Sequence, residues 1–66
     1  MNDTITFKEC IEWLEGIIKI YNNCKMKSQK EKIRCEIIGC AFMIEELFDT
    51  YIYTDILPNG KMKLSY

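Results

Sequence analysis

The chain has 66 residues, of which 48% are hydrophobic and 29% charged, and its formal net charge at pH 7 is -1. A chain of this length forms one domain at most, and such a domain buries only about 60% of the surface that its unfolded chain exposes. The near-neutral charge favours neither a binder of polyanions nor an acidic mimic of DNA.

The first predicted element is a helix over about residues 7–22. Thr6 and Glu9 have the spacing of a capping box, in which each side chain bonds to a backbone N–H of the first turn. Asn22 and Asn23 tolerate a left-handed backbone and are predicted to end the helix. Apolar residues follow helical spacing in two adjacent stripes, one made of Phe7, Ile11, Leu14, Ile18 and Tyr21 and the other of Cys10, Trp13, Ile17, Ile20 and Cys24.

A second helix is predicted over about residues 29–53. Ser28 and Glu31 repeat the capping-box spacing, so residues 23–27 form a short connector and the two helices are antiparallel neighbours. The apolar residues of this helix follow one ladder, which consists of Ile33, Ile37, Cys40, Ile44, Leu47 and Tyr51. Residues 51–54 are aromatic and β-branched enough to suit a strand, but they also continue this ladder. We therefore place the end of the helix near Tyr53.

A turn or ribbon is predicted over residues 54–66. Pro58, Asn59 and Gly60 form a turn signal, and Lys61, Met62, Lys63 and Leu64 alternate behind it. Whether this segment forms a short β-hairpin stays open. Because an isolated two-stranded ribbon is only marginally stable in water, it would have to pack on the helices or pair across a dimer.

The two stripes of the first helix form an apolar surface wider than one neighbouring helix can cover. We therefore predict a mainly all-α fold, a single domain over residues 1–66 in which an antiparallel helical hairpin forms a homodimeric four-helix bundle. The interface with a second copy or with another protein is assigned to Cys10, Trp13, Ile17, Ile20, Phe48 and Tyr51.

The four cysteines lack the spacing of a zinc site. Only Cys35 and Cys40 come near it, and five helical positions place them roughly 140° apart around the axis. We expect small buried side chains with free thiols, Cys24 being the most reactive, and no metal or cofactor. The chain has no histidine, and acids such as Glu45 and Asp49 are typical of a solvated helix face, so no enzymatic activity is predicted.

The charges are separated along the chain. A basic patch surrounds the start of the second helix, whereas acids dominate its remainder, which is the reverse of what the helix dipole favours. Two hairpins packed head to tail would bring opposite charges together. The basic patch consists of Lys25, Lys27, Lys30, Lys32 and Arg34.

These patterns predict a small non-catalytic protein-interaction module that acts as an inhibitor or adaptor. Its expected partners are a second copy and an unidentified protein. Its size alone, and no motif, would fit an inhibitor from a phage or other mobile element that is aimed at a host nucleic-acid enzyme. The alternative is a small nucleic-acid-binding regulator that uses the basic patch. No apolar stretch reaches the roughly 18 residues of a membrane span and residues 1–6 lack a secretory signal, so a cytoplasmic location without a membrane partner is expected.

Overall fold

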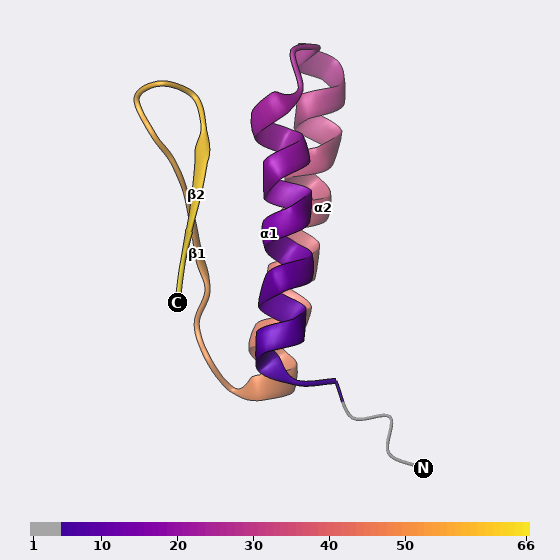
Figure 1. The fold of residues 1–66 in the computed structure, drawn as a ribbon, viewed down its shortest axis with the longest axis vertical. Coiled ribbons are helices and arrows are strands. Elements are labelled where there is room, and N and C mark those ends of the chain that lie inside the picture. The colour runs from indigo at the N-terminus through magenta and orange to yellow at the C-terminus, as the bar shows by residue number, and fades with distance from the viewer. Residues whose placement is uncertain (1–4) are drawn as a thin grey trace.

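The computed structural model describes residues 5–66, which form two helices followed by a β-hairpin (Figure 1). Helix α1 spans Phe7–Asn23, α2 spans Lys27–Phe48, strand β1 spans Tyr53–Ile56 and strand β2 spans Met62–Ser65. The helices lie side by side and antiparallel, and the β-hairpin runs along one side of the pair. The mainly helical prediction is confirmed, and the segment left open in the sequence is an antiparallel β-hairpin.

The start of α1 is the capping box that the sequence predicts. The Thr6 hydroxyl accepts a hydrogen bond of 3.1 Å from the Glu9 backbone N–H, and the Glu9 carboxylate accepts one of 3.1 Å from the Thr6 backbone N–H. The pKa of Glu9 lies below its ordinary value of 4.5. The hydrogen bond from the Thr6 backbone N–H contributes most to this lowering, and the hydrogen bond from the Thr6 hydroxyl contributes less. The stabilisation by this carboxylate is therefore complete above that value and is lost as the pH falls through the lowered pKa.

Two boundaries near the connector differ from the prediction. Helix α1 continues through Asn23, and Cys24 follows it in an extended conformation, so the left-handed turn predicted at the two asparagines does not form. Helix α2 begins at Lys27 with Met26 as its N-cap, because the Lys30 N–H closes the first turn on the Met26 carbonyl at 2.9 Å. The capping box predicted from Ser28 is therefore wrong.

Helix α2 ends at Phe48 and not near Tyr53. Asp49 adopts the left-handed conformation, with φ 51° and ψ 55°, and the backbone N–H groups of Asp49 and Thr50 both donate to the Glu45 carbonyl. An aspartate tolerates this conformation better than most residues do. The chain thereby leaves the helix axis and returns Ile52 to the core, where only 8% of the residue is exposed.

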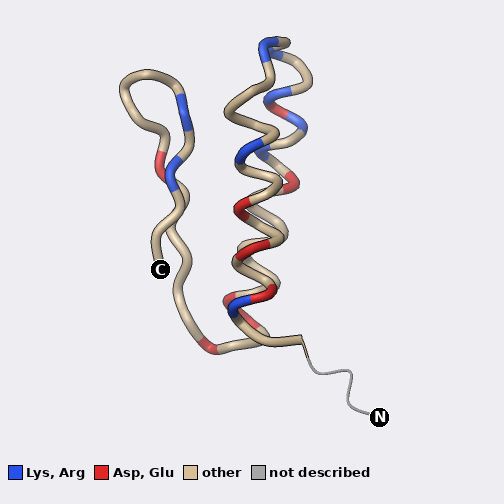
Figure 2. Tube along the Cα trace, viewed as in Figure 1, with Lys and Arg blue, Asp and Glu red and all other residues tan. Residues whose placement is uncertain are grey.

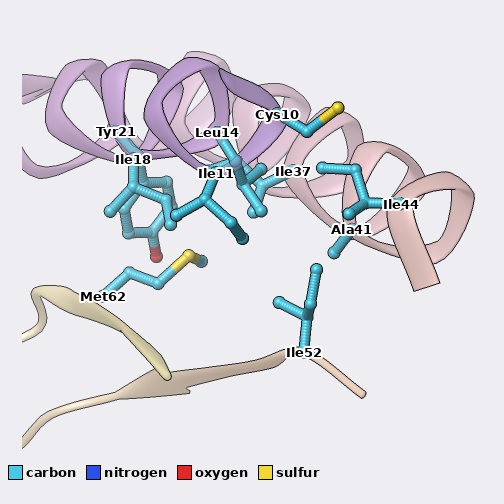
Figure 3. Packing of buried hydrophobic residues seen from close by; sticks show 10 residues of the cluster. All are labelled: Cys10, Ile11, Leu14, Ile18, Tyr21, Ile37, Ala41, Ile44, Ile52 and Met62. Carbon is cyan, nitrogen blue, oxygen red and sulfur yellow. The ribbon is translucent and has the colours of Figure 1, made fainter. Parts of the chain in front are cut away.

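The core lies between the two helices and the β-hairpin (Figure 3). Leu14 of α1 and Ile37 of α2 are completely buried at its centre. At one end, the Phe7 ring packs edge-on against Phe48 and Tyr66, at centroid distances of 5.4 and 5.5 Å. The buried set comprises Cys10, Ile11, Leu14, Ile18, Tyr21, Ile37, Ala41, Ile44, Ile52 and Met62.

Three polar side chains of the helices hold the β-hairpin. The Asn22 carboxamide bonds twice to Met62, its Nδ2 donating to the carbonyl at 3.2 Å and its Oδ1 accepting from the N–H at 2.7 Å. The Glu45 carboxylate accepts from the Ile52 N–H at 2.7 Å. The Lys30 ammonium donates to the Gly60 carbonyl at 3.4 Å and lies 4.8 Å from the centre of the Tyr21 ring. The β-hairpin is thus an integral part of the domain.

The predicted turn of the β-hairpin is confirmed. Gly60 has φ 85°, a conformation that residues with a Cβ rarely adopt. The Leu57 N–H donates to the Lys61 carbonyl at 2.8 Å, and the Asn59 side chain accepts from the Lys61 N–H at 3.0 Å. These bonds fix the register in which Ile56 lies opposite Met62.

We expect Asn22→Ala to lower the free energy of unfolding by about 1–3 kcal/mol, because both backbone groups of Met62 lose their partner. Asn23→Ala is the matched control, since it makes the same change of helix propensity at an exposed side chain and should cost less than about 0.5 kcal/mol. Urea unfolding of both variants measures the difference. Equal stabilities would show that the Asn22 bonds do not hold the β-hairpin.

Candidate protein-interaction surface

The side of the helix pair that faces away from the β-hairpin is not covered by any segment within residues 5–66. Cys10, at its edge, points away from the strands in Figure 3. On α1, Trp13 and Ile20 are exposed and Ile17 is half-buried between them, so these three residues follow one stripe. The Trp13 surface, as we call this region, consists of Ile5, Cys10, Trp13, Ile17, Ile20, Cys40, Met43 and Leu47.

The Trp13 surface contains an apolar groove between the two helices. Its volume is about 320 Å³, and it is lined on the α1 side by Cys10 and Trp13 and on the α2 side by Cys40, Met43 and Leu47. Trp13 is 58% exposed and Leu47 is 71% exposed. Large apolar side chains this exposed and this close together make the Trp13 surface a candidate interaction surface.

Helix α2 also carries apolar residues on its opposite flank. Ile38 and Phe42 are 49% and 61% exposed, although the core residues Ile37 and Ala41 are their direct neighbours. We call Ile38 and Phe42 the α2 flank. Residues 37–44 of α2 contain no polar side chain, and a helical segment that is apolar on every side is normally buried, so the described chain covers this part of α2 incompletely.

The structure brings together only some of the predicted interface residues. Trp13, Ile17 and Ile20 lie on the Trp13 surface, and Cys10 is buried at its edge. Phe48 is half-buried against Phe7 inside the chain. Tyr51 lies in the loop after α2, where it is 74% exposed. The predicted interface does not include Ile38 and Phe42 of the α2 flank, although their four-residue spacing places them on one face of a helix.

The charges are separated along the long axis of the molecule (Figure 2). Basic residues gather at the connector end and acidic residues at the opposite end of the helix pair. Two members of the basic patch have partners within the chain. The Lys30 ammonium donates to the Gly60 carbonyl, and the Arg34 guanidinium lies 3.5 Å from the Glu31 carboxylate. The other members of the basic patch, Lys25, Lys27 and Lys32, are exposed.

The β-hairpin extends this basic end. Its turn lies beside the start of α2, and Lys61 shares a hollow with Lys19 and Asn23 of α1. Lys63 follows on β2. These lysines are not part of the predicted basic patch, because their position depends on the packing of the β-hairpin.

All four cysteines are free thiols in different environments. Cys10 is buried, and the Cys24 thiol donates to the Met26 carbonyl at 3.6 Å. Burial, and then the nearby charge of Glu36, raise the pKa of Cys40 above its ordinary value of 9.0. Cys35 is the exposed thiol, which was not expected from the sequence. Within residues 5–66, no three potential metal ligands gather, and no helix is long and apolar enough to cross a membrane.

We expect iodoacetamide at neutral pH to alkylate Cys35 first, because the side chain is exposed. Cys40 should react slowly, since its raised pKa leaves little of the nucleophilic thiolate, and Cys10 should react only after unfolding. Peptide mass spectrometry over time gives the order. Faster labelling of Cys40 than of Cys35 would contradict the described environments.

The described residues thus offer an apolar surface and a polarised charge distribution as the features through which the protein can act. Comparisons with protein-family models, with curated proteins and with solved structures find no match to this chain.

Proposed function

We propose that the protein is a small non-catalytic interaction module of the cytoplasm that acts as an inhibitor or adaptor by binding proteins. The exposed Trp13 surface is the observation that carries this proposal. Tryptophan is among the residues that contribute most to binding at protein interfaces, and methionine adapts its shape to a partner. Size alone suggests the target class, a host nucleic-acid enzyme inhibited by a product of a phage or other mobile element.

A second copy is the proposed occupant of the Trp13 surface, and the two helix pairs then form a four-helix bundle. The groove between α1 and α2 can accept the side chains of another helix pair. At Gly16, on the same side of α1, an added Cβ would meet no atom within 4 Å, so a second backbone can approach there. The separated charges favour an antiparallel arrangement, in which the basic end of each copy lies beside the acidic end of the other.

We expect the protein to sediment at twice its mass of 7.9 kDa in dilute buffer. Trp13→Ala should weaken this dimer by about 2 kcal/mol or more, because the side chain is a central anchor of the interface. It should change the stability of the monomer little, since Trp13 is 58% exposed there. Sedimentation equilibrium gives both dissociation constants.

Tyr53→Ala is the matched control, because Tyr53 is a similarly exposed aromatic residue, at 57%, on the β-hairpin. It should leave the Trp13 dimer unchanged. A wild-type protein that stays monomeric would contradict the four-helix bundle and would leave the Trp13 surface to a foreign protein. Equal effects of the two variants would contradict the assignment of the interface.

Binding of nucleic acid is the second candidate function, and the lysines that the β-hairpin adds to the basic end favour it. The double variant Lys27→Glu and Lys32→Glu separates the two functions, because both side chains are exposed and neither holds the fold. If the charges align two copies, the variant should weaken the dimer by up to about 1 kcal/mol for each pair of charges. If they bind nucleic acid, the dimer should persist while retention on DNA or RNA, and its steep salt dependence, disappear.

A further inference from the structure

The two edges of the β-hairpin differ in how the helices cover them. The bond between Leu57 and Lys61 makes these residues a hydrogen-bonded pair. In an antiparallel ribbon such pairs alternate with pairs whose N–H and C=O groups point outward. In the observed register, the pairs whose backbone groups point outward are therefore Ile56 with Met62 and Thr54 with Leu64.

The outer edge of β2 lies against α1, where Asn22 occupies the outward groups of Met62. On the outer edge of β1, Glu45 occupies the N–H of Ile52, just before the strand. Next along this edge, the outward N–H and C=O groups of Thr54 and Ile56 have no hydrogen-bond partner in the part of the chain that the structure describes. Such groups are a template for another strand.

Both ends of the open edge of β1 lie close to α2. Glu45 contacts the residue before β1, and Glu31 shares a hollow with Ile56 at its other end. Between these two points on α2 lie Ile38 and Phe42. All four residues follow helical spacing and share one strip of α2. A strand added to β1 would therefore cover apolar side chains that are now about half exposed.

We propose that β1 pairs antiparallel with β1 of a second copy, which joins two β-hairpins into one continuous sheet. This contact is separate from the Trp13 surface and goes beyond the proposed function. A two-fold axis at Thr54 lets the two Thr54 residues exchange both backbone hydrogen bonds and places Ile52 opposite Ile56 of the second copy. The alternative axis at Asp55 would put two aspartates directly opposite each other, which is unfavourable.

Charge complementarity also favours a second copy as the occupant. The strands run along the long axis of the molecule, as the helices do (Figure 1). An antiparallel pair of strands therefore places the basic end of one copy beside the acidic end of the other. The α2 flanks of both copies then approach each other beneath the joined sheet and lose their exposure to water.

The test uses Trp13→Ala as the background, so that a failure of the four-helix bundle and a failure of this contact are distinguishable. At millimolar concentration, this variant should still form a dimer by sedimentation equilibrium. Adding Thr54→Pro should raise the dissociation constant at least about tenfold, because it removes an outward N–H at a position where an edge strand tolerates proline. Thr54→Val is the matched control, since it keeps the N–H, and should differ less than about threefold.

Phe42→Glu is a second variant that leaves the β-hairpin unchanged, and it should also raise the dissociation constant at least about tenfold, because it introduces charge between the two α2 flanks. The Met62 amide resonance reports whether the β-hairpin of Thr54→Pro stays folded. If the β-hairpin of Thr54→Pro is unfolded, the dissociation constant of the Phe42→Glu variant alone tests the proposal. A monomeric Trp13→Ala protein at millimolar concentration, or a dimer insensitive to Phe42→Glu, would overturn the proposal.

Discussion

The pair of hydrogen bonds between the Asn22 side chain and the Met62 backbone organises the molecule. A two-stranded ribbon is marginal by itself, and these bonds attach it to α1 while they occupy the outward backbone groups of Met62 on the outer edge of β2. Met62 is thereby held in the core, where it covers the α1 stripe that includes Ile11 and Ile18. Among the residues that the structure describes, the helix pair is covered on this side only. The position of the β-hairpin thus determines which apolar residues remain exposed.

Two surfaces stay uncovered for this reason, and they differ in chemistry. The Trp13 surface is a side-chain groove between two helices, suited to the ridges of other helices. The edge of β1 with the α2 flank combines free backbone groups with apolar side chains, a combination suited to an extended strand. The separated charges give both proposed contacts the same antiparallel preference. These two exposed surfaces are the basis of the proposed interaction module.

Local signals in the sequence were sufficient where neighbouring residues decide the structure. The capping box at Thr6, the buried α1 stripe and the turn at Gly60 are of this kind. The end of α2 was placed too late because Tyr51 and Ile52 continue the helical period, whereas the return of Ile52 to the core and its bond to Glu45 stop the helix. Asn22 was assigned to a turn, since nothing nearby reveals a partner forty residues away. The second α1 stripe predicted that Trp13 is not buried by the neighbouring helix, and Trp13 is exposed, whereas the exposure of Phe42 depends on where the β-hairpin packs.

Native-state hydrogen exchange of the wild-type protein, at a concentration too low for strand pairing, tests this account most directly. The four backbone amides of Ile52, Thr54, Ile56 and Met62 all point to an outer edge of the ribbon. We expect the Met62 and Ile52 amides to be protected, because Asn22 and Glu45 accept their hydrogen bonds. The Thr54 and Ile56 amides should exchange rapidly. A Met62 amide that exchanges as fast as Thr54 would contradict the attachment of the β-hairpin by Asn22, and with it the identity of both uncovered surfaces.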